Sequence, residues 1–128
     1  MNPEDPMFPL YNVGGMLQSS KRLSYRQRLV AGHNTYFRFL QDNGLTTRVI
    51  LEAGQLPGPE TVVRRGDLTE EGFEFIRRAE KKWWGMFDRR AATDPSAVND
   101  TRILERELKK LRAERGGSEG ENRTGTDR

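Results

Sequence analysis

Cysteine is absent from this chain of 128 residues, and histidine occurs only once. Without cysteine there is no disulfide framework, no thiolate nucleophile and no cysteine-based zinc or iron–sulfur site, which is typical of a reducing compartment. With one histidine, a metal site would have to be built from carboxylates. We therefore expect neither a metal nor a cofactor.

Long apolar runs are also absent. No stretch approaches the roughly 18 apolar residues of a membrane-spanning helix. The opening, Met1 to Pro9, has neither the basic start nor the apolar run of a secretory signal. We therefore expect a soluble, cytoplasmic protein with no membrane partner.

Apolar residues are few: 34% of the chain is hydrophobic and 32% is charged. An average domain has about 45% apolar residues when glycine is counted and about 25% charged residues, so part of this chain should lie outside the core. Proline, glycine and polar residues predict an extended, flexible arm, a linker and a disordered tail. The predicted segments are an arm at 1–22, a core domain at 23–90, a linker at 91–99, an amphipathic helix at 100–115 and a tail at 116–128.

The core domain opens with a predicted helix. Ser24 can form a capping box with Gln27, and Asn43-Gly44 suits a left-handed stop. Between these signals the apolar residues repeat with a helical period. They form a face of Tyr25, Leu29, His33, Tyr36, Phe37 and Leu40.

Two β-like runs follow this helix. Residues 46–53 and 61–65 are rich in β-branched and apolar side chains, and the breaker group 57–59 separates them. This pattern predicts a β-hairpin that packs on the helix. The predicted fold class is therefore small α+β: a helix, a hairpin, a long helix and a short C-terminal helix.

The long helix is predicted from Thr69, its N-cap, to about Arg89. Its apolar arc spans about 180°, against little more than 100° for an ordinary surface helix. The other apolar residues are too few to cover this arc alone. We therefore expect another protein, a second copy of the chain or the N-terminal arm to cover part of it. The predicted partner-binding residues are Trp83, Trp84, Phe75, Met86, Leu104, Leu108 and Leu111.

Glu80 projects into the middle of the same arc, where a carboxylate needs a partner. Arg26, which falls on the apolar face of the first helix, and His33 are the candidates. Glu80 could instead serve as a general acid with a raised pKa. A structural polar pair is favoured because nothing else supplies a second catalytic group, and we predict that the chain is not an enzyme.

One stretch resembles a known family. The run Phe39 to Thr47, the two β-like runs and the Leu68–Gly72 helix start together resemble the second half of MarR/PadR-type winged-helix domains, over about residues 39–90. The resemblance implies a DNA-contacting first helix, a wing that touches phosphates and dimerisation through the tryptophan helix. Its nucleic-acid residues would be Arg28, Arg38, Arg48, Arg64 and Arg65.

Charge is unevenly distributed. Residues 17–90 carry fourteen bases against nine acids, whereas residues 91–128 carry eight of each. A pI near 9.5 suits an acidic partner, either nucleic acid or an acidic protein face. We therefore predict a small, non-enzymatic protein-binding protein of bacterial type, an adaptor, an immunity or antitoxin-like protein, or an obligate dimer. The alternative is a winged-helix-like DNA-binding regulator.

Overall fold

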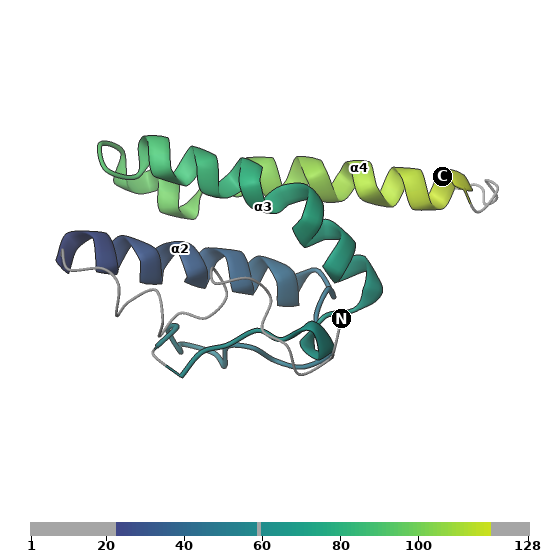
Figure 1. Cartoon of the computed structure of the whole chain (residues 1–128), viewed down its shortest axis with the longest axis horizontal. Helices are drawn as coiled ribbons and strands as arrows, with labels where there is room; N and C mark the ends of the chain where they lie inside the picture. Colours follow the sequence, from purple (N-terminus) through teal and green to yellow (C-terminus); the bar gives the residue numbers. More distant parts are fainter. Residues whose placement is uncertain (1–22, 59, 119–128) are drawn as a thin grey trace.

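The computed structural model describes residues 23–58 and 60–118 of the chain. In that range it contains three α-helices and two short 3₁₀ helices: α2 (Leu23–Asp42), η2 (Arg65–Asp67), α3 (Glu70–Arg90), η3 (Pro95–Asn99) and α4 (Arg102–Ser118). The helices α3 and α4 lie side by side, α2 lies along them, and the irregular segment between α2 and α3 lies on the far side of α2 (Figure 1). The predicted arm at 1–22 is outside the described residues.

The predicted α+β fold is wrong, because residues 43–69 form no strand in the described part of the chain. Two of the β-like side chains, Leu51 and Val63, are fully or almost fully buried and serve as apolar anchors, whereas Val49 is exposed. The side chain of Gln41 takes the place of a strand partner: its Oε1 accepts from the backbone N–H groups of Ile50 and Leu51 at 2.9 and 3.0 Å. Because these backbone N–H groups have a side-chain acceptor, they do not need the hydrogen bonds of a neighbouring strand.

The end of α2 confirms the predicted stop. The helix ends at Asp42, and Gly44 has a φ of 71° in the left-handed region. The N–H of Leu45 then donates to the carbonyl oxygen of Leu40 at 2.9 Å, which closes the last turn. The helix begins at Leu23, one residue before the predicted start.

The start of α3 also agrees with the sequence. Thr69 is the N-cap, and its side chain accepts from the N–H of Gly72 at 2.9 Å. The backbone N–H of Thr69 donates to the carbonyl oxygen of Leu45 at 3.0 Å, so the helix starts against the end of α2. This close approach leaves no room for a side chain at Gly72.

The core is one cluster formed by all three helices and the irregular segment. On α3, Phe75, Ile76 and Trp83 have no exposed surface. The helices α2 and α4 cover this arc with buried side chains, and Thr35 Oγ1 of α2 donates to the carbonyl oxygen of Val98 in η3 at 2.5 Å. These side chains include Tyr36, Phe37, Leu40, Leu104, Leu108 and Leu111.

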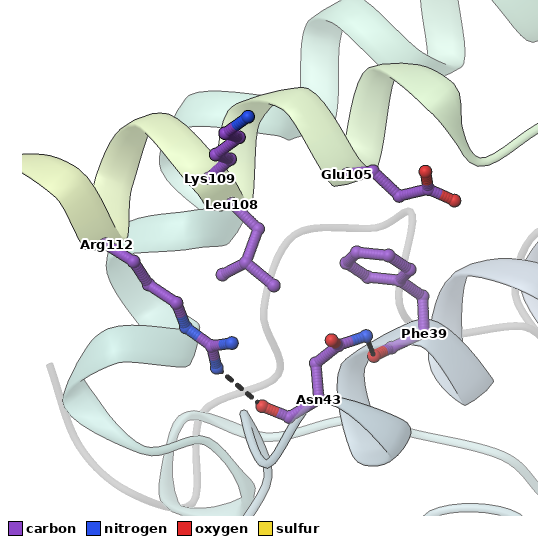
Figure 2. A pocket seen from close by; sticks show the side chains of 6 residues that line it. All are labelled: Phe39, Asn43, Glu105, Leu108, Lys109 and Arg112. Atoms are coloured by element: carbon purple, nitrogen blue, oxygen red, sulfur yellow. Dashed lines mark hydrogen bonds between the residues drawn. The ribbon is translucent and has the colours of Figure 1, made fainter. Parts of the chain in front are cut away.

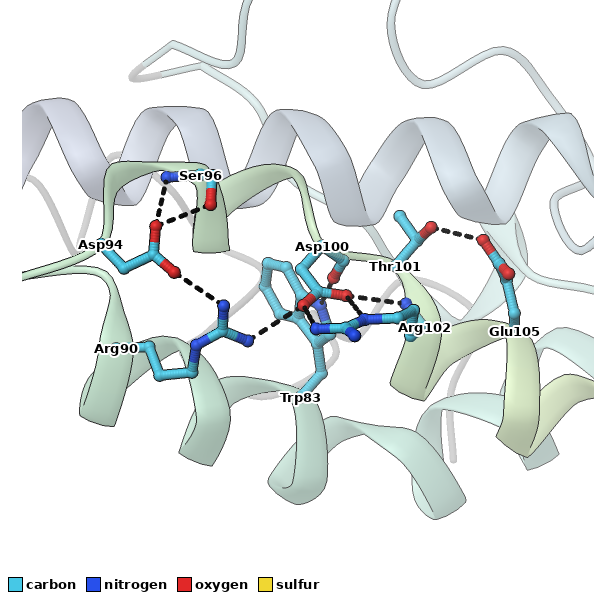
Figure 3. A network of polar contacts seen from close by, with 8 residues as sticks. All are labelled: Trp83, Arg90, Asp94, Ser96, Asp100, Thr101, Arg102 and Glu105. Carbon is cyan, nitrogen blue, oxygen red and sulfur yellow. Dashed lines mark hydrogen bonds and ion pairs between the residues drawn. The ribbon is translucent and has the colours of Figure 1, made fainter.

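The predicted linker at 91–99 is a structured corner that contains η3 (Figure 3). Arg90 bridges Asp94 at 2.7 Å and Asp100 at 2.9 Å. The indole Nε1 of Trp83 donates to the carbonyl oxygen of Asp100 at 2.7 Å. The hydrogen bond from Arg102 holds the pKa of Asp100 well below its usual range. The corner therefore directs α4 back along α3, and α4 continues past the predicted boundary at 115 to Ser118.

Two glycines of α3 give opposite predictions. A Cβ at Gly72 would lie 2.1 Å from the carbonyl oxygen of Leu45, so Gly72→Ala should lower the free energy of unfolding by about 1–3 kcal/mol. A Cβ at Gly85 would meet only the end of the flexible Arg89 side chain at 3.4 Å. Gly85→Ala should therefore raise that free energy by up to about 1 kcal/mol.

Urea unfolding followed by circular dichroism measures both changes. A Gly72→Ala variant as stable as the wild type would contradict the contact between the start of α3 and Leu45.

Candidate functional site

The residues predicted to bind a partner lie in the interior of the chain. All seven are buried, and Trp84 is the most exposed of them at 6%. Because the corner at η3 turns α4 back along α3, the leucine stripe of α4 packs against the aromatic arc rather than facing solvent. The arc is therefore covered within one chain, and a binding surface has to be sought elsewhere.

The arginines predicted to contact nucleic acid do not form one basic surface. Arg48 pairs with Asp67 at 2.8 Å, and Arg65 pairs with Glu70 at 2.8 Å. Arg38 donates to the backbone oxygens of the irregular segment. Arg38 and Arg65 thus join the irregular segment to α2 and α3, whereas Arg48 joins two parts of that segment. Of the other two, Arg28 lies on α2 and Arg64 lies directly before η2.

The predicted polar pair is also not formed. His33 is fully buried, its Nδ1 donates to the carbonyl oxygen of Leu29 at 2.7 Å, and its ring lies 4.7 Å from that of Trp84. Glu80 is half-buried and makes no ion pair with the described residues, while Arg26 is exposed. Burial raises the pKa of Glu80, and the charge of Lys81 opposes that rise.

A groove opens where the end of α2 meets α4 (Figure 2). Its volume is about 210 Å³. Phe39 of α2 and Leu108 of α4 form an apolar floor, and polar side chains surround them. The complete lining is Phe39, Asn43, Glu105, Leu108, Lys109 and Arg112.

Arg112 holds the groove in shape. Its Nη2 donates to the carbonyl oxygen of Asn43 at 2.7 Å, and the same guanidinium pairs with Glu71 of α3 at 3.2 Å. Asn43 Nδ2 in turn donates to the carbonyl oxygen of Phe39 at 2.9 Å. A cation is favourable at the C-terminal end of α2, where the helix dipole is negative. The groove is therefore built into the packing of the three helices.

The charges at the rim of the groove differ in how they are used. Glu105 accepts a hydrogen bond from the hydroxyl of Thr101 at 2.6 Å. Arg112 is committed to Asn43 and Glu71. Lys109 points outward from α4, away from the floor (Figure 2), and forms no ion pair with another described residue. The exposed carboxylate of Glu105 keeps its negative charge, because the hydroxyl of Thr101 is neutral, and Lys109 is the cation of this rim that forms no ion pair with another described residue.

Sequence reasoning missed the groove because its two walls are far apart in the chain. The sequence predicts Leu108 as a partner-binding residue, but nothing in the sequence indicates that this residue meets Phe39 across the end of α2. The sequence signal nearest to the site is the helix stop at Asn43-Gly44, which indicates that another element could pack against the end of α2. Only the path of η3 shows that this element is α4.

The comparisons found no match to this chain among protein-family models, curated proteins or solved structures. Membership of a winged-helix family therefore stays a prediction. The hairpin wing that this family would require is not formed in the described part of segment 43–69. In residues 23–58 and 60–118 no helix has the length and apolar character needed to cross a membrane. The same residues contain no cluster of three or more metal-ligating side chains.

Glu80 gives a pH-dependent prediction. Because burial raises the pKa of its carboxyl group in the folded chain, the ionised form costs stability above that pKa, and the cost disappears as the pH falls through it. Glu80→Gln should therefore raise the free energy of unfolding at neutral pH, and the gain should vanish near the ordinary carboxyl pKa of 4.5.

Urea unfolding across this pH range checks the prediction, with Glu74→Gln as the control because Glu74 is exposed on the same helix. A Glu80→Gln variant that is less stable than wild type at neutral pH would show that the carboxylate has a stabilising partner.

Proposed function

We propose that this chain is a small, non-enzymatic protein-binding module that holds a segment of its partner in the groove between α2 and α4. The observation that carries the proposal is the groove itself, in which an apolar floor from two helices is bordered by polar side chains. Protein interfaces combine an apolar centre with a polar rim in the same way.

The dimensions of the groove favour a protein segment over a small metabolite. Small-molecule sites are usually enclosed and occupy about 300–1,000 Å³. This groove is smaller, at about 210 Å³, and open. It suits one apolar side chain of a partner, inserted between Phe39 and Leu108 as an anchor.

The chemistry at the rim favours binding over catalysis. General acid–base catalysis needs a titratable group poised to exchange a proton with a substrate. The one carboxylate of the lining, Glu105, already accepts from Thr101, and Arg112 is held by Asn43. These hydrogen bonds fix the two side chains in place, which supports a role of the groove in binding.

Peptide selection tests the proposal. A phage-displayed library of random peptides about 16 residues long, panned on the immobilised full chain, should yield groove ligands. Glu105→Trp places an indole at the rim and should weaken the selected peptides by about tenfold or more.

The matched control is Asp88→Trp, which also replaces an exposed acid by an indole, but on α3 and outside the groove lining. Selected peptides that bind both variants as well as wild type would place their site elsewhere on the chain. A selection that yields no specific peptide would count against the proposal itself.

A further inference from the structure

The charges of α4 are sorted by the fold. Residues 102–118 contain six bases and three acids. Glu107 is only 3% exposed and pairs with Lys82 of α3 at 2.9 Å, and Glu114 pairs with Arg78 of α3 at 2.6 Å. The third acid, Glu105, accepts from Thr101. Two of the three carboxylates are therefore paired with cations of α3, and Glu105 stays exposed with a neutral hydroxyl as its partner.

The outward side of α4 is left with cations. At about 100° per residue, five exposed residues fall within one sector of the helix. None of the five is acidic. We call this sector the basic face, and it consists of Arg102, Arg106, Lys109, Lys110 and Ala113.

The cations of the basic face differ in how far they are neutralised. Arg102 pairs with Asp100 at 2.6 Å, and Lys110 lies 3.8 Å from Glu107. Arg106 and Lys109 form no ion pair with other described residues. They stand three residues apart, so their side chains project from neighbouring turns of the helix.

Lys109 connects the two surfaces. It lines the groove, and it also belongs to the basic face. Beyond it, Arg106 extends the positive charge away from the apolar floor formed by Phe39 and Leu108. A partner segment anchored in the groove would thus lie beside two cations that form no ion pair with the described residues.

We infer that the segment bound in the groove is acidic, with an apolar anchor side chain followed by aspartate or glutamate residues that face Lys109 and Arg106. This inference rests on the proposed function and adds the chemistry of the partner. Complementary charge at the edge of an apolar contact sets specificity and association rate, and salt screens it.

An acidic protein segment fits this surface better than a nucleic acid. A phosphate backbone requires a row of cations and has no use for an apolar cavity beside them. Here Lys109 borders the floor formed by Phe39 and Leu108, and the carboxylate of Asp100 lies beside Arg102. An acidic peptide with one apolar anchor uses both features.

Fluorescence anisotropy on the full chain tests the inference with three labelled probes. The first is the acidic peptide Ac-EELFDELLDEE-NH2, and the second is its neutral counterpart Ac-QQLFNQLLNQQ-NH2. The third is a random DNA duplex of about 20 base pairs. The acidic peptide should bind at least about tenfold more tightly than the neutral one, and added salt should weaken it.

Charge reversal locates the contact. The double variant Arg106→Glu/Lys109→Glu should weaken the acidic peptide by about tenfold or more. The matched control is Arg77→Glu/Lys81→Glu, which reverses two exposed cations of α3 and should leave affinity within about twofold. Because all four side chains are exposed, circular dichroism should show an unchanged helical fold in both variants.

The outcomes separate the inference from the proposed function. If the acidic and neutral peptides bind equally and the Glu105→Trp variant binds neither, the inference of an acidic partner fails. The proposal that the groove binds a protein segment then stands. If duplex DNA binds more tightly than the acidic peptide, and the double variant loses this DNA binding, the partner is a nucleic acid and the inference of an acidic peptide is wrong. If neither designed peptide binds but library-selected peptides do, only the inference fails. If no peptide of either kind binds, both fail.

Discussion

The burial of one helix face governs the rest of this structure. The apolar arc of α3 is wider than one neighbouring helix can cover, and the chain covers it from two sides with α2 and α4. Trp83 ties the arc to the corner before α4, since its indole donates to the carbonyl oxygen of Asp100 at 2.7 Å. Burying such large aromatic side chains removes the most apolar surface from water per residue, so this packing is the main source of stability.

This use of the arc decides where function can lie. Once Trp83 and Trp84 are covered within the chain, they are no longer a surface for a partner. The packing that covers them brings Leu108 of α4 across the end of α2, where it meets Phe39 and forms the groove. It also turns Glu107 inward against Lys82, which leaves the outer side of α4 basic. The groove and the basic face thus both follow from the docking of α4.

Local signals in the sequence predicted the helices well. The N-cap at Thr69 and the stop at Gly44 depend on nearby backbone groups, so residue type alone indicates them. The hairpin prediction failed because two side chains of α2, Gln41 and Arg38, satisfy backbone groups between residues 50 and 55 that a neighbouring strand would have bonded. The site was not predictable for a related reason. The meeting of Phe39 with Leu108, and the inward turn of Glu107, depend on long-range packing that helical periodicity does not encode.

Tryptophan fluorescence tests the central claim, that one chain covers its own aromatic arc. Acrylamide should quench the wild-type protein several times less efficiently than the urea-unfolded chain, and equally at all protein concentrations, because Trp83 and Trp84 are 0% and 6% exposed. The Ala113→Trp variant supplies an exposed indole as a positive control. Quenching of the folded wild type as efficient as that of the unfolded chain would contradict the account. So would quenching that decreases as the protein is concentrated, because a second copy would then be covering the arc.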